Sequence, residues 1–188
     1  MINKRNLPKE TIRDFKLLGF YIAIIWIIEI TNQTIQHGLN QYGLVPREIE
    51  QIYGVVTVHF LHWGFGHLIS NTLPLLFLGA MLCFSGQALR VSISIALICG
   101  ISVWIFARSG THVGASGLVM GYWGYLISKA LFDRSLKNLL LGIITIALYG
   151  GIVFSLFDFR ASISFEGHLF GFASGVLVAW GLSRLKTK

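Results

Sequence analysis

The sequence predicts an all-α membrane protein, a polytopic bundle of six transmembrane helices. Three observations lead to this fold class. Of its 188 residues, 54% are hydrophobic and only 12% are charged, outside the range of ordinary soluble domains. The apolar residues gather in six segments, and Lys and Arg are distributed unevenly between the connections. Because the length suits one domain, we expect residues 1–188 to form a single membrane domain.

Six apolar segments account for the predicted spans. Each has about the length needed to cross a hydrocarbon core of ~30 Å. They cover residues 15–31, 68–84, 91–106, 115–132, 139–157 and 167–182. A basic segment, 1–14, precedes the first span, and only the first connection, 32–67, is long.

The basic residues predict the orientation of these spans. Twelve of the fifteen Lys and Arg residues fall on the side that holds both ends of the chain. An excess of Lys and Arg marks the cytoplasmic side of a membrane protein. We therefore expect the chain to lie in the plasma membrane with both termini in the cytoplasm. The long loop 32–67 then lies outside. The net charge of +7 therefore reflects topology and does not indicate a nucleic-acid partner.

A serine and a histidine occur at similar predicted depth. Ser116 lies thirteen residues before Lys129, and His168 lies sixteen residues before Arg184. At a rise of ~1.5 Å per residue, these separations place the two side chains ~20 and ~24 Å above the basic boundary. Polar residues inside a membrane are candidates for function. At matching depth, these two side chains have the chemistry of a nucleophile and its base.

Glycines four residues apart accompany both polar side chains. Gly117 and Gly121 follow Ser116, while Gly167, Gly171 and Gly175 surround His168. Small residues at this spacing let two membrane helices approach closely, which would carry Ser116 toward His168. The alternative is that both stripes are general packing devices, because the motif is common.

His67 and Asn71 share one helix face at the outer end of the second segment. Both can donate hydrogen bonds, as an oxyanion hole requires; the alternative is that they bond each other or cap a loop. His62 is expected to fix the loop backbone. A metal site is a weak rival for these histidines, because no HExxH motif occurs. Cys83 and Cys99 are expected to be small buried hydrophobes.

Two acidic residues need a separate interpretation. Glu29 is expected near the membrane interface or in contact with the long loop. Glu166 precedes His168 by two residues and therefore points to another helix face. It could be the acid of a triad, but a position at a helix start, where a negative charge favours the dipole, is the preferred interpretation.

The order of these motifs resembles the rhomboid family of intramembrane serine proteases, over about residues 44–182. The motifs are His62-x4-His67-x3-Asn71, Gly114-Ala115-Ser116-Gly117 and Gly167-His168-x2-Gly171-x3-Gly175. The resemblance implies a nucleophile at Ser116, in a loop with Gly114 and Gly117, and a general base at His168, with no carboxylate. It further implies an oxyanion hole formed by His67, Asn71 and the Ser116 N–H, a first loop braced by His62, and a cap over the site at 157–165.

Two positions depart from the best-known bacterial members of that family. Met120 stands where an aromatic residue stacks under the catalytic histidine, and Tyr53-Gly54 replaces a Trp-Arg pair of the first loop. A thioether can fill the space of a ring and contact one. Neither position supplies a reacting group, so we expect the chemistry to be unaffected.

The predicted function is therefore serine endopeptidase activity on peptide bonds in or near transmembrane segments of other proteins. The expected partners are such membrane proteins and the lipid bilayer, with no nucleic acid, metal or organic cofactor. One alternative is a catalytically silent rhomboid-like protein that binds membrane helices. Another is a small membrane transporter, which the lack of paired intramembrane charges and of an inverted repeat disfavours.

Overall fold

The structure, a computed structural model, describes residues 8–157 and 164–185. Helices make up nearly all of this part of the chain, and the isolated bridge between Leu44 and His112 is its one β-type pairing. In chain order the elements are α1 (Lys9–Thr34), η2 (Gly38–Tyr42), η3 (Ile49–Gln51), α2 (Gly54–Thr57), η4 (Val58–Phe60), α3 (Phe65–Cys83), α4 (Ala88–Phe106), α5 (Ser116–Phe132), α6 (Leu136–Tyr149), η5 (Gly150–Phe157) and α7 (Phe165–Leu185).

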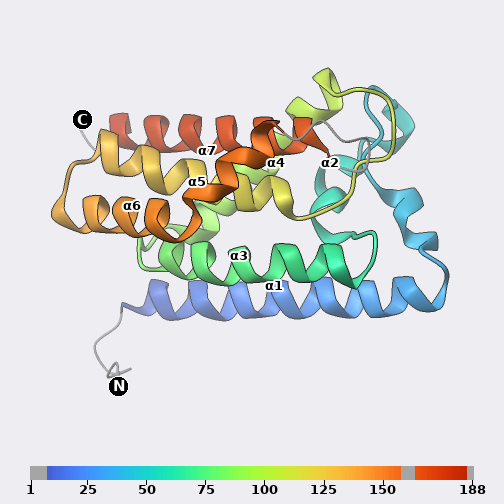
Figure 1. Ribbon diagram of the computed structural model, residues 1–188, viewed down its shortest axis with the longest axis horizontal. Coiled ribbons are helices and arrows are strands. Elements are labelled where there is room, and N and C mark those ends of the chain that lie inside the picture. Colours follow the sequence, from blue (N-terminus) through green and yellow to red (C-terminus); the bar gives the residue numbers. More distant parts are fainter. Residues whose placement is uncertain (1–7, 158–163, 186–188) are drawn as a thin grey trace.

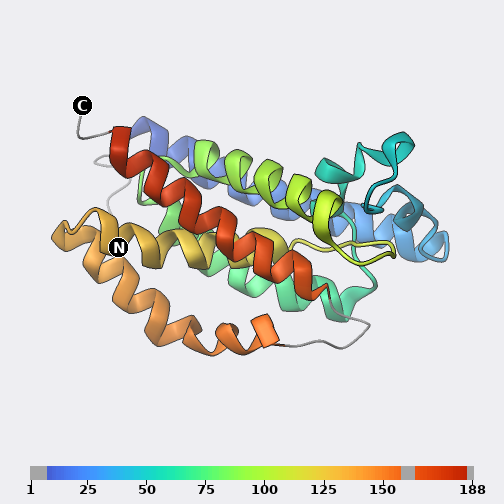
Figure 2. The ribbon, with the colours of Figure 1, turned by 90° about the horizontal axis from the view of Figure 1, so that it is seen from above.

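The long helices run side by side, with α1 beside α3 along one edge of the bundle (Figure 1). Seen from above, α7 crosses the bundle with α4 on one flank and α5 and α6 on the other (Figure 2). The first turn of α1 and the last turn of α7 lie at the same end of the molecule (Figure 1). Loop 32–67 forms a lobe at the opposite end, which contains η2, η3, α2 and η4.

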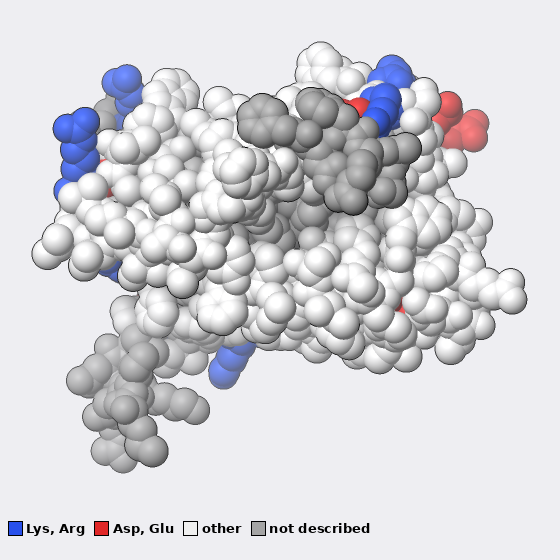
Figure 3. All heavy atoms as spheres, in the orientation of Figure 1, with Lys and Arg blue, Asp and Glu red and all other residues white. Residues whose placement is uncertain are grey.

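Four segments are long and apolar enough to cross a membrane: Phe65–Cys83, Ala88–Phe106, Leu136–Leu156 and Phe165–Leu185. The prediction of an all-helical fold is thus confirmed for the described residues, and four of the six predicted spans are among these candidate segments. The other two predicted spans correspond to α1 and to α5, which has 17 residues. In the face shown in Figure 3, Lys and Arg gather mostly toward the two ends, which leaves a largely uncharged middle.

The fifth predicted span differs from its expected form. Residues 139–157 were expected to form one helix, but α6 ends at Tyr149 and a 3-10 segment continues from Gly150 to Phe157. Two consecutive glycines, Gly150 and Gly151, begin that segment. Glycine lowers helix stability by up to ~1 kcal/mol per residue, so the α-helix stops where the pair begins. This change brings the η5 backbone to α7.

Helix α5 occupies the centre of the bundle, with most of its residues buried, and its most extensive partner is α7. Glycines allow this approach. A Cβ atom placed on Gly171 would overlap the carbonyl oxygen of Gly117, and one on Gly175 would overlap that of Gly121. The two backbones therefore touch, as small residues permit in membrane helices. Side chains of any size at these positions would separate Ser116 from the helix that carries His168.

Candidate active site

Ser116 is the first residue of α5, and the chain reaches it through a turn that requires glycine. Gly114 has φ +131°, a conformation that L side chains rarely adopt and glycine adopts readily. A Cβ atom at Gly114 would also lie 2.8 Å from Nε2 of His67. Both the backbone conformation and the close approach of the imidazole explain why glycine precedes Ser116 by two residues. The α5 N-terminus then directs its unpaired N–H groups toward the serine.

A cavity of about 880 Å³ brings together residues from three helices. Its walls include Ser116 and Met120 from α5, His168 from α7, and His67 and Asn71 from α3. Thus the serine, the histidine and both predicted amide or imidazole donors open onto one space. The cap predicted at 157–165 falls largely on residues 158–163, outside the described part of the chain.

The ring of His168 is oriented by a backbone carbonyl. Nδ1 of His168 lies 3.1 Å from the carbonyl oxygen of Ser155 in η5. A carbonyl can only accept, so Nδ1 donates, and the neutral imidazole carries its lone pair on Nε2. Nε2 is then the atom that can accept a proton. The sequence gives no signal for this contact, because every residue has a carbonyl group.

Met120 is buried and joins the same contact. The single proton of the Ser155 hydroxyl is shared between the carbonyl of Ile152 at 2.7 Å and Sδ of Met120 at 3.5 Å. The thioether therefore holds the segment whose carbonyl orients His168. Met120 lies one turn along α5 from Ser116, and its influence on His168 passes through η5.

Asn71 presents a buried donor beside the serine loop. Among the described residues, its Nδ2 has no hydrogen-bond partner, and it lies 3.7 Å from the position of a Cβ atom built on Gly114. Nδ1 of His67 accepts weakly from the Trp63 N–H at 3.5 Å, which leaves the proton on Nε2, the atom facing Gly114. A buried donor without a partner costs free energy. Such a donor is suited to a ligand oxygen in the cavity.

His62 is fully buried and packs edge-on against His67, with ring centroids 5.2 Å apart. Burial, aided by the nearby His67, lowers the pKa of His62 to about 3, so the ring stays neutral. The hydrogen bonds that tie this residue to the loop run through its carbonyl, which accepts from Asn40 at 3.0 Å and Asn32 at 3.4 Å. The main chain of His62 thus takes part in bracing the loop.

The first loop holds the serine loop by its backbone. Leu44 and His112 exchange two N–H···O bonds of 3.0 and 2.8 Å, and the Gly114 N–H donates to Val58 at 2.9 Å. Gly54 lies against this junction, where a Cβ would come within 2.6 Å of the Leu44 Cα. Glycine at the second position of Tyr53-Gly54 therefore permits a close backbone contact.

The two acidic residues take the interpretations preferred above. Glu166 lies in the first turn of α7, and its Oε1 pairs with Nε of Arg108 at 3.2 Å. Glu29 is buried and accepts from Gln33 at 3.2 Å, with His37 of the long loop 3.8 Å away.

His112 and Ser164 are residues that the sequence analysis did not single out. Nε2 of His112 donates to the Arg108 carbonyl at 3.1 Å, so its Nδ1 accepts from the Ser164 hydroxyl at 2.8 Å. The Ser164 oxygen in turn accepts from the Gly167 N–H at 3.1 Å, which makes Ser164 the N-cap of α7. A serine just before a helix is a recognisable cap signal, whereas a contact across 52 residues is not.

The fold and the site define an integral membrane protein of the helical-bundle class, with a polar cavity between its helices. A sequence profile of the Rhomboid domain matches residues 49–185. The chain belongs to the rhomboid family. It is 29% identical to an uncharacterized protein of Mycobacterium tuberculosis, across 96% of this chain and 80% of that protein.

Two further relatives carry rhomboid names. The chain is 31% identical to RHOMBOID-like protein 4 of Arabidopsis thaliana, across 68% of this chain and 33% of that protein. It is 30% identical to the Bacillus subtilis protein YdcA, whose name assigns it provisionally to the rhomboid proteases, across 67% and 65% of the two chains.

Proposed function

We propose that the chain is an intramembrane serine endopeptidase that cleaves peptide bonds in or near transmembrane segments of other membrane proteins. One observation carries the proposal: Ser116, His168, His67 and Asn71 line the same cavity. The bond from His168 Nδ1 to the Ser155 carbonyl supports it, because it leaves Nε2 as the proton acceptor.

The reaction proceeds through an acyl-enzyme. Oγ of Ser116 attacks the substrate carbonyl carbon and gives its proton to Nε2 of His168. The negative oxygen that forms accepts from the Ser116 N–H, Nδ2 of Asn71 and Nε2–H of His67. His168 then protonates the leaving amine as the C–N bond breaks. A water molecule, deprotonated by His168, releases the acyl group, and Ser116 recovers its proton.

Positioning residues support this pair. The Ser155 carbonyl keeps His168 in the tautomer that accepts at Nε2, and Met120 holds Ser155. His112 connects the loop that leads to Ser116 with the start of α7. Its ring accepts a hydrogen bond from Ser164, the N-cap residue of α7, and its backbone belongs to that loop. Every step uses groups of this chain, so the proposal includes no metal or organic cofactor.

The proposed orientation follows from the distribution of charge. Both termini lie in the cytoplasm, all six segments cross the plasma membrane, and the cavity opens toward the external side. Substrates then reach Ser116 from the bilayer or its outer surface.

Cleavage of a membrane-spanning test peptide by the purified protein in proteoliposomes tests the proposal. We expect Ser116→Ala and His168→Ala each to lose several orders of magnitude in turnover, since members of such a unit act together. Ser109→Ala, which changes another serine lining the cavity, is the matched control and should retain activity. Near-normal turnover by Ser116→Ala would exclude the serine mechanism. Binding of the peptide without cleavage by the wild-type protein would favour the catalytically silent alternative.

A further inference from the structure

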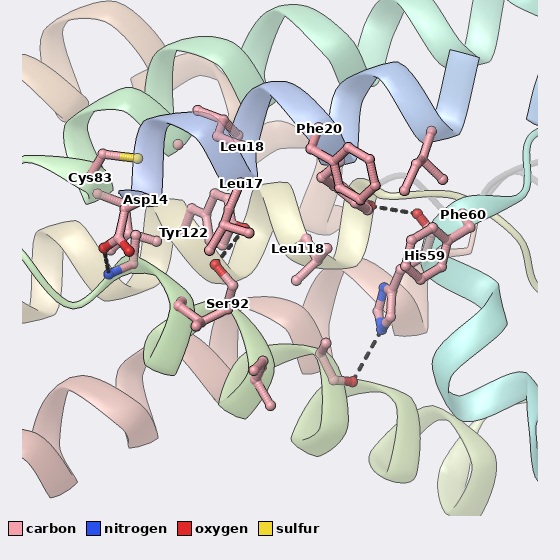
Figure 4. Close-up of a pocket in the computed structure, with 18 of the residues that line it drawn as sticks. Asp14, Leu17, Leu18, Phe20, His59, Phe60, Cys83, Ser92, Leu118 and Tyr122 are labelled. Carbon is pink, nitrogen blue, oxygen red and sulfur yellow. Dashed lines mark hydrogen bonds between the residues drawn. The ribbon is translucent and has the colours of Figure 1, made fainter. Parts of the chain in front are cut away.

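A second cavity, an apolar groove of about 530 Å³, lies between α1 and α4 (Figure 4). Leu118 and Tyr122 of α5 form its floor, and His59 and Phe60 close one end. Its rims carry exposed apolar side chains, among them Phe20. The volume falls within the range of lipid-sized and drug-sized ligand sites, ~300–1,000 Å³.

The polar side chains in the walls are engaged with the protein, except that the buried Nδ1 of His59 has no hydrogen-bond partner among the described residues. Oγ of Ser92 and the Tyr122 hydroxyl share a hydrogen bond of 2.7 Å. The buried Asp14 carboxylate accepts from the Ala88 N–H at 3.0 Å and pairs with Arg13 at 2.8 Å. Figure 4 shows the Ser92 and Tyr122 hydroxyls directed at each other and the Asp14 carboxylate directed at a backbone N–H. Because the walls present few polar atoms to an occupant, a hydrocarbon chain suits the interior. An empty groove would lose the dispersion contacts of its lining atoms.

The length of the groove discriminates between a lipid chain and a protein helix. On α1 the lining residues run from Asp14 to Ile24, which is ~15 Å at 1.5 Å per residue. That is about half of a ~30 Å hydrocarbon core, or one leaflet. A transmembrane helix needs the whole core, and with a diameter of ~10 Å it would meet His59 and Phe60 at the closed end.

Two cations lie near the other end of the groove, where Asp14 bonds the first residue of α4. Arg13 and Lys16 are exposed on α1, one turn before the lining residues Leu17 and Phe20, and therefore on the same faces of the helix. Arg13 binds Asp14 with two of its nitrogens, and its side chain remains 53% exposed. A headgroup beside them is favoured if it carries negative charge.

We propose that this groove binds one acyl chain of an anionic phospholipid, with the headgroup phosphate beside Arg13 and Lys16. The lipid belongs to the leaflet at the basic end of the bundle. Its chain covers Leu118 and Tyr122 on the face of α5 that is turned toward α1 and α4. This site is separate from the cavity at Ser116 and requires no catalytic activity.

Photocrosslinking tests the proposal with the full chain in vesicles. The probes are phosphatidylglycerol and phosphatidylcholine, each with a diazirine at the end of one acyl chain. We expect phosphatidylglycerol to label the part of the groove farthest from Arg13 and Lys16, residues 21–24 of α1 and 93–97 of α4, above all other lipid-facing positions. Its yield should exceed that of phosphatidylcholine by about fivefold for each cation that contacts the headgroup.

Matched variants test where the acyl chain and the headgroup of the lipid bind. Ala96→Phe, or Ile93→Trp if the first variant does not fold, should abolish the selective labelling by filling the groove. Ile101→Phe, exposed on α4 outside the groove, should leave it unchanged. Arg13→Gln with Lys16→Gln should remove the preference for phosphatidylglycerol, whereas Arg134→Gln should keep it.

Three results would overturn the proposal: uniform labelling of all lipid-facing helices, equal wild-type yields from the two lipids, or undiminished labelling in both groove-filling variants. Displacement of the label by a transmembrane peptide would assign the groove to a protein segment instead.

Discussion

Two helix pairs in this bundle are built in opposite ways. Between α5 and α7 the backbones touch along Gly117, Gly121, Gly171 and Gly175. Between α1 and α4 there is little direct contact, and large side chains border a groove.

The difference shows that one bundle can contain a helix pair of fixed separation and a helix pair whose packing can vary. A contact between backbones fixes the separation of two helices, since neither partner can change rotamer to relieve it. The α5–α7 pair carries Ser116 and His168, whose relative position decides whether a proton can be transferred. The α1–α4 pair carries no proposed reacting group, so a variable filling of hydrocarbon can complete its packing.

The largest expected effect comes from filling the α5–α7 contact. Gly171→Val, and likewise Gly121→Val, should abolish activity and lower the free energy of unfolding by more than about 3 kcal/mol, the upper end of ordinary overpacking. At position 171 the valine would overlap the backbone of Gly117, which cannot move aside. At position 121 it would overlap the Ile95 side chain of α4 and crowd the carbonyl oxygen of Gly171. Melting temperature and cleavage in detergent, measured over Gly, Ala and Val, should fall as side-chain volume grows.

Gly181 of the same helix is the matched control, because a Cβ there meets nothing within 4 Å. Gly181→Val should fold and cleave normally. Equal damage at positions 171 and 181 would mean that the backbone contact does not determine the site.

A smaller loss is expected from the donor that α3 contributes. Asn71→Ala should lower kcat by ~10²–10³-fold, the usual cost of one oxyanion donor, while KM changes little. His67→Ala should behave similarly, with an added loss of stability because its ring packs on Gly114. Steady-state kinetics with Ile69→Ala, exposed on another face of α3, provide the baseline. If Asn71→Ala changed only KM, its side chain would be a binding group instead.

Two buried histidines of the first loop allow the two regions to be compared through the pH dependence of stability. His59 borders the groove, and His62 packs against His67 of the cavity wall; burial lowers their pKa values to about 4 and about 3. Since the unfolded chain binds these protons near pH 6.5, stability is full above that pH and falls as the pH drops toward 4. The slope should approach ~1.4 kcal/mol per pH unit for each histidine.

Melting curves between pH 7.5 and 5 measure this effect. His59→Gln and His62→Gln should each reduce the slope, and the double variant should flatten it. A wild-type melting temperature that stays constant down to pH 5 would contradict the burial of neutral imidazoles at both places.

The smallest effect is expected at the junction of the serine loop and α7. His112→Asn keeps an acceptor near Ser164, whereas His112→Gln extends past it toward the Arg108 carbonyl. Because one positioning hydrogen bond is worth about 1.4 kcal/mol, or tenfold, we expect His112→Gln and Ser164→Ala to lower kcat about tenfold at constant KM. His112→Asn should retain most of the wild-type kcat. Identical kinetics for Asn and Gln would assign His112 a purely structural role.

The features that depend on periodic or local patterns could be predicted from the sequence. Apolar segments predicted the helical membrane fold, and the glycine spacing predicted which helices meet. Depth counted from Lys129 and Arg184 suggested that Ser116 and His168 share a level, and both line one cavity. Their chemical roles remain predictions.

The remaining features arise from tertiary contacts that no local pattern encodes. The carbonyl of Ser155 reaches His168 only because the helix changes to 3-10 form at Gly150. His112 finds Ser164 across 52 residues. The groove between α1 and α4 is a space that the side chains of these helices leave unfilled. The sequence does not reveal it, because apolar periodicity is the same for a helix that faces protein and one that faces lipid.

Labelling by a fluorophosphonate probe tests the central claim most directly, because it reports the nucleophile without any assumption about substrate. The account predicts that the probe modifies Ser116 of the detergent-solubilised protein, as located by mass spectrometry of the labelled peptide. Labelling should be slow or absent in His168→Ala and Gly171→Val, and should proceed at the wild-type rate in Gly181→Val. Modification of another serine, or equal labelling of Ser116 with and without His168, would contradict the claim that the α5–α7 contact pairs these two residues.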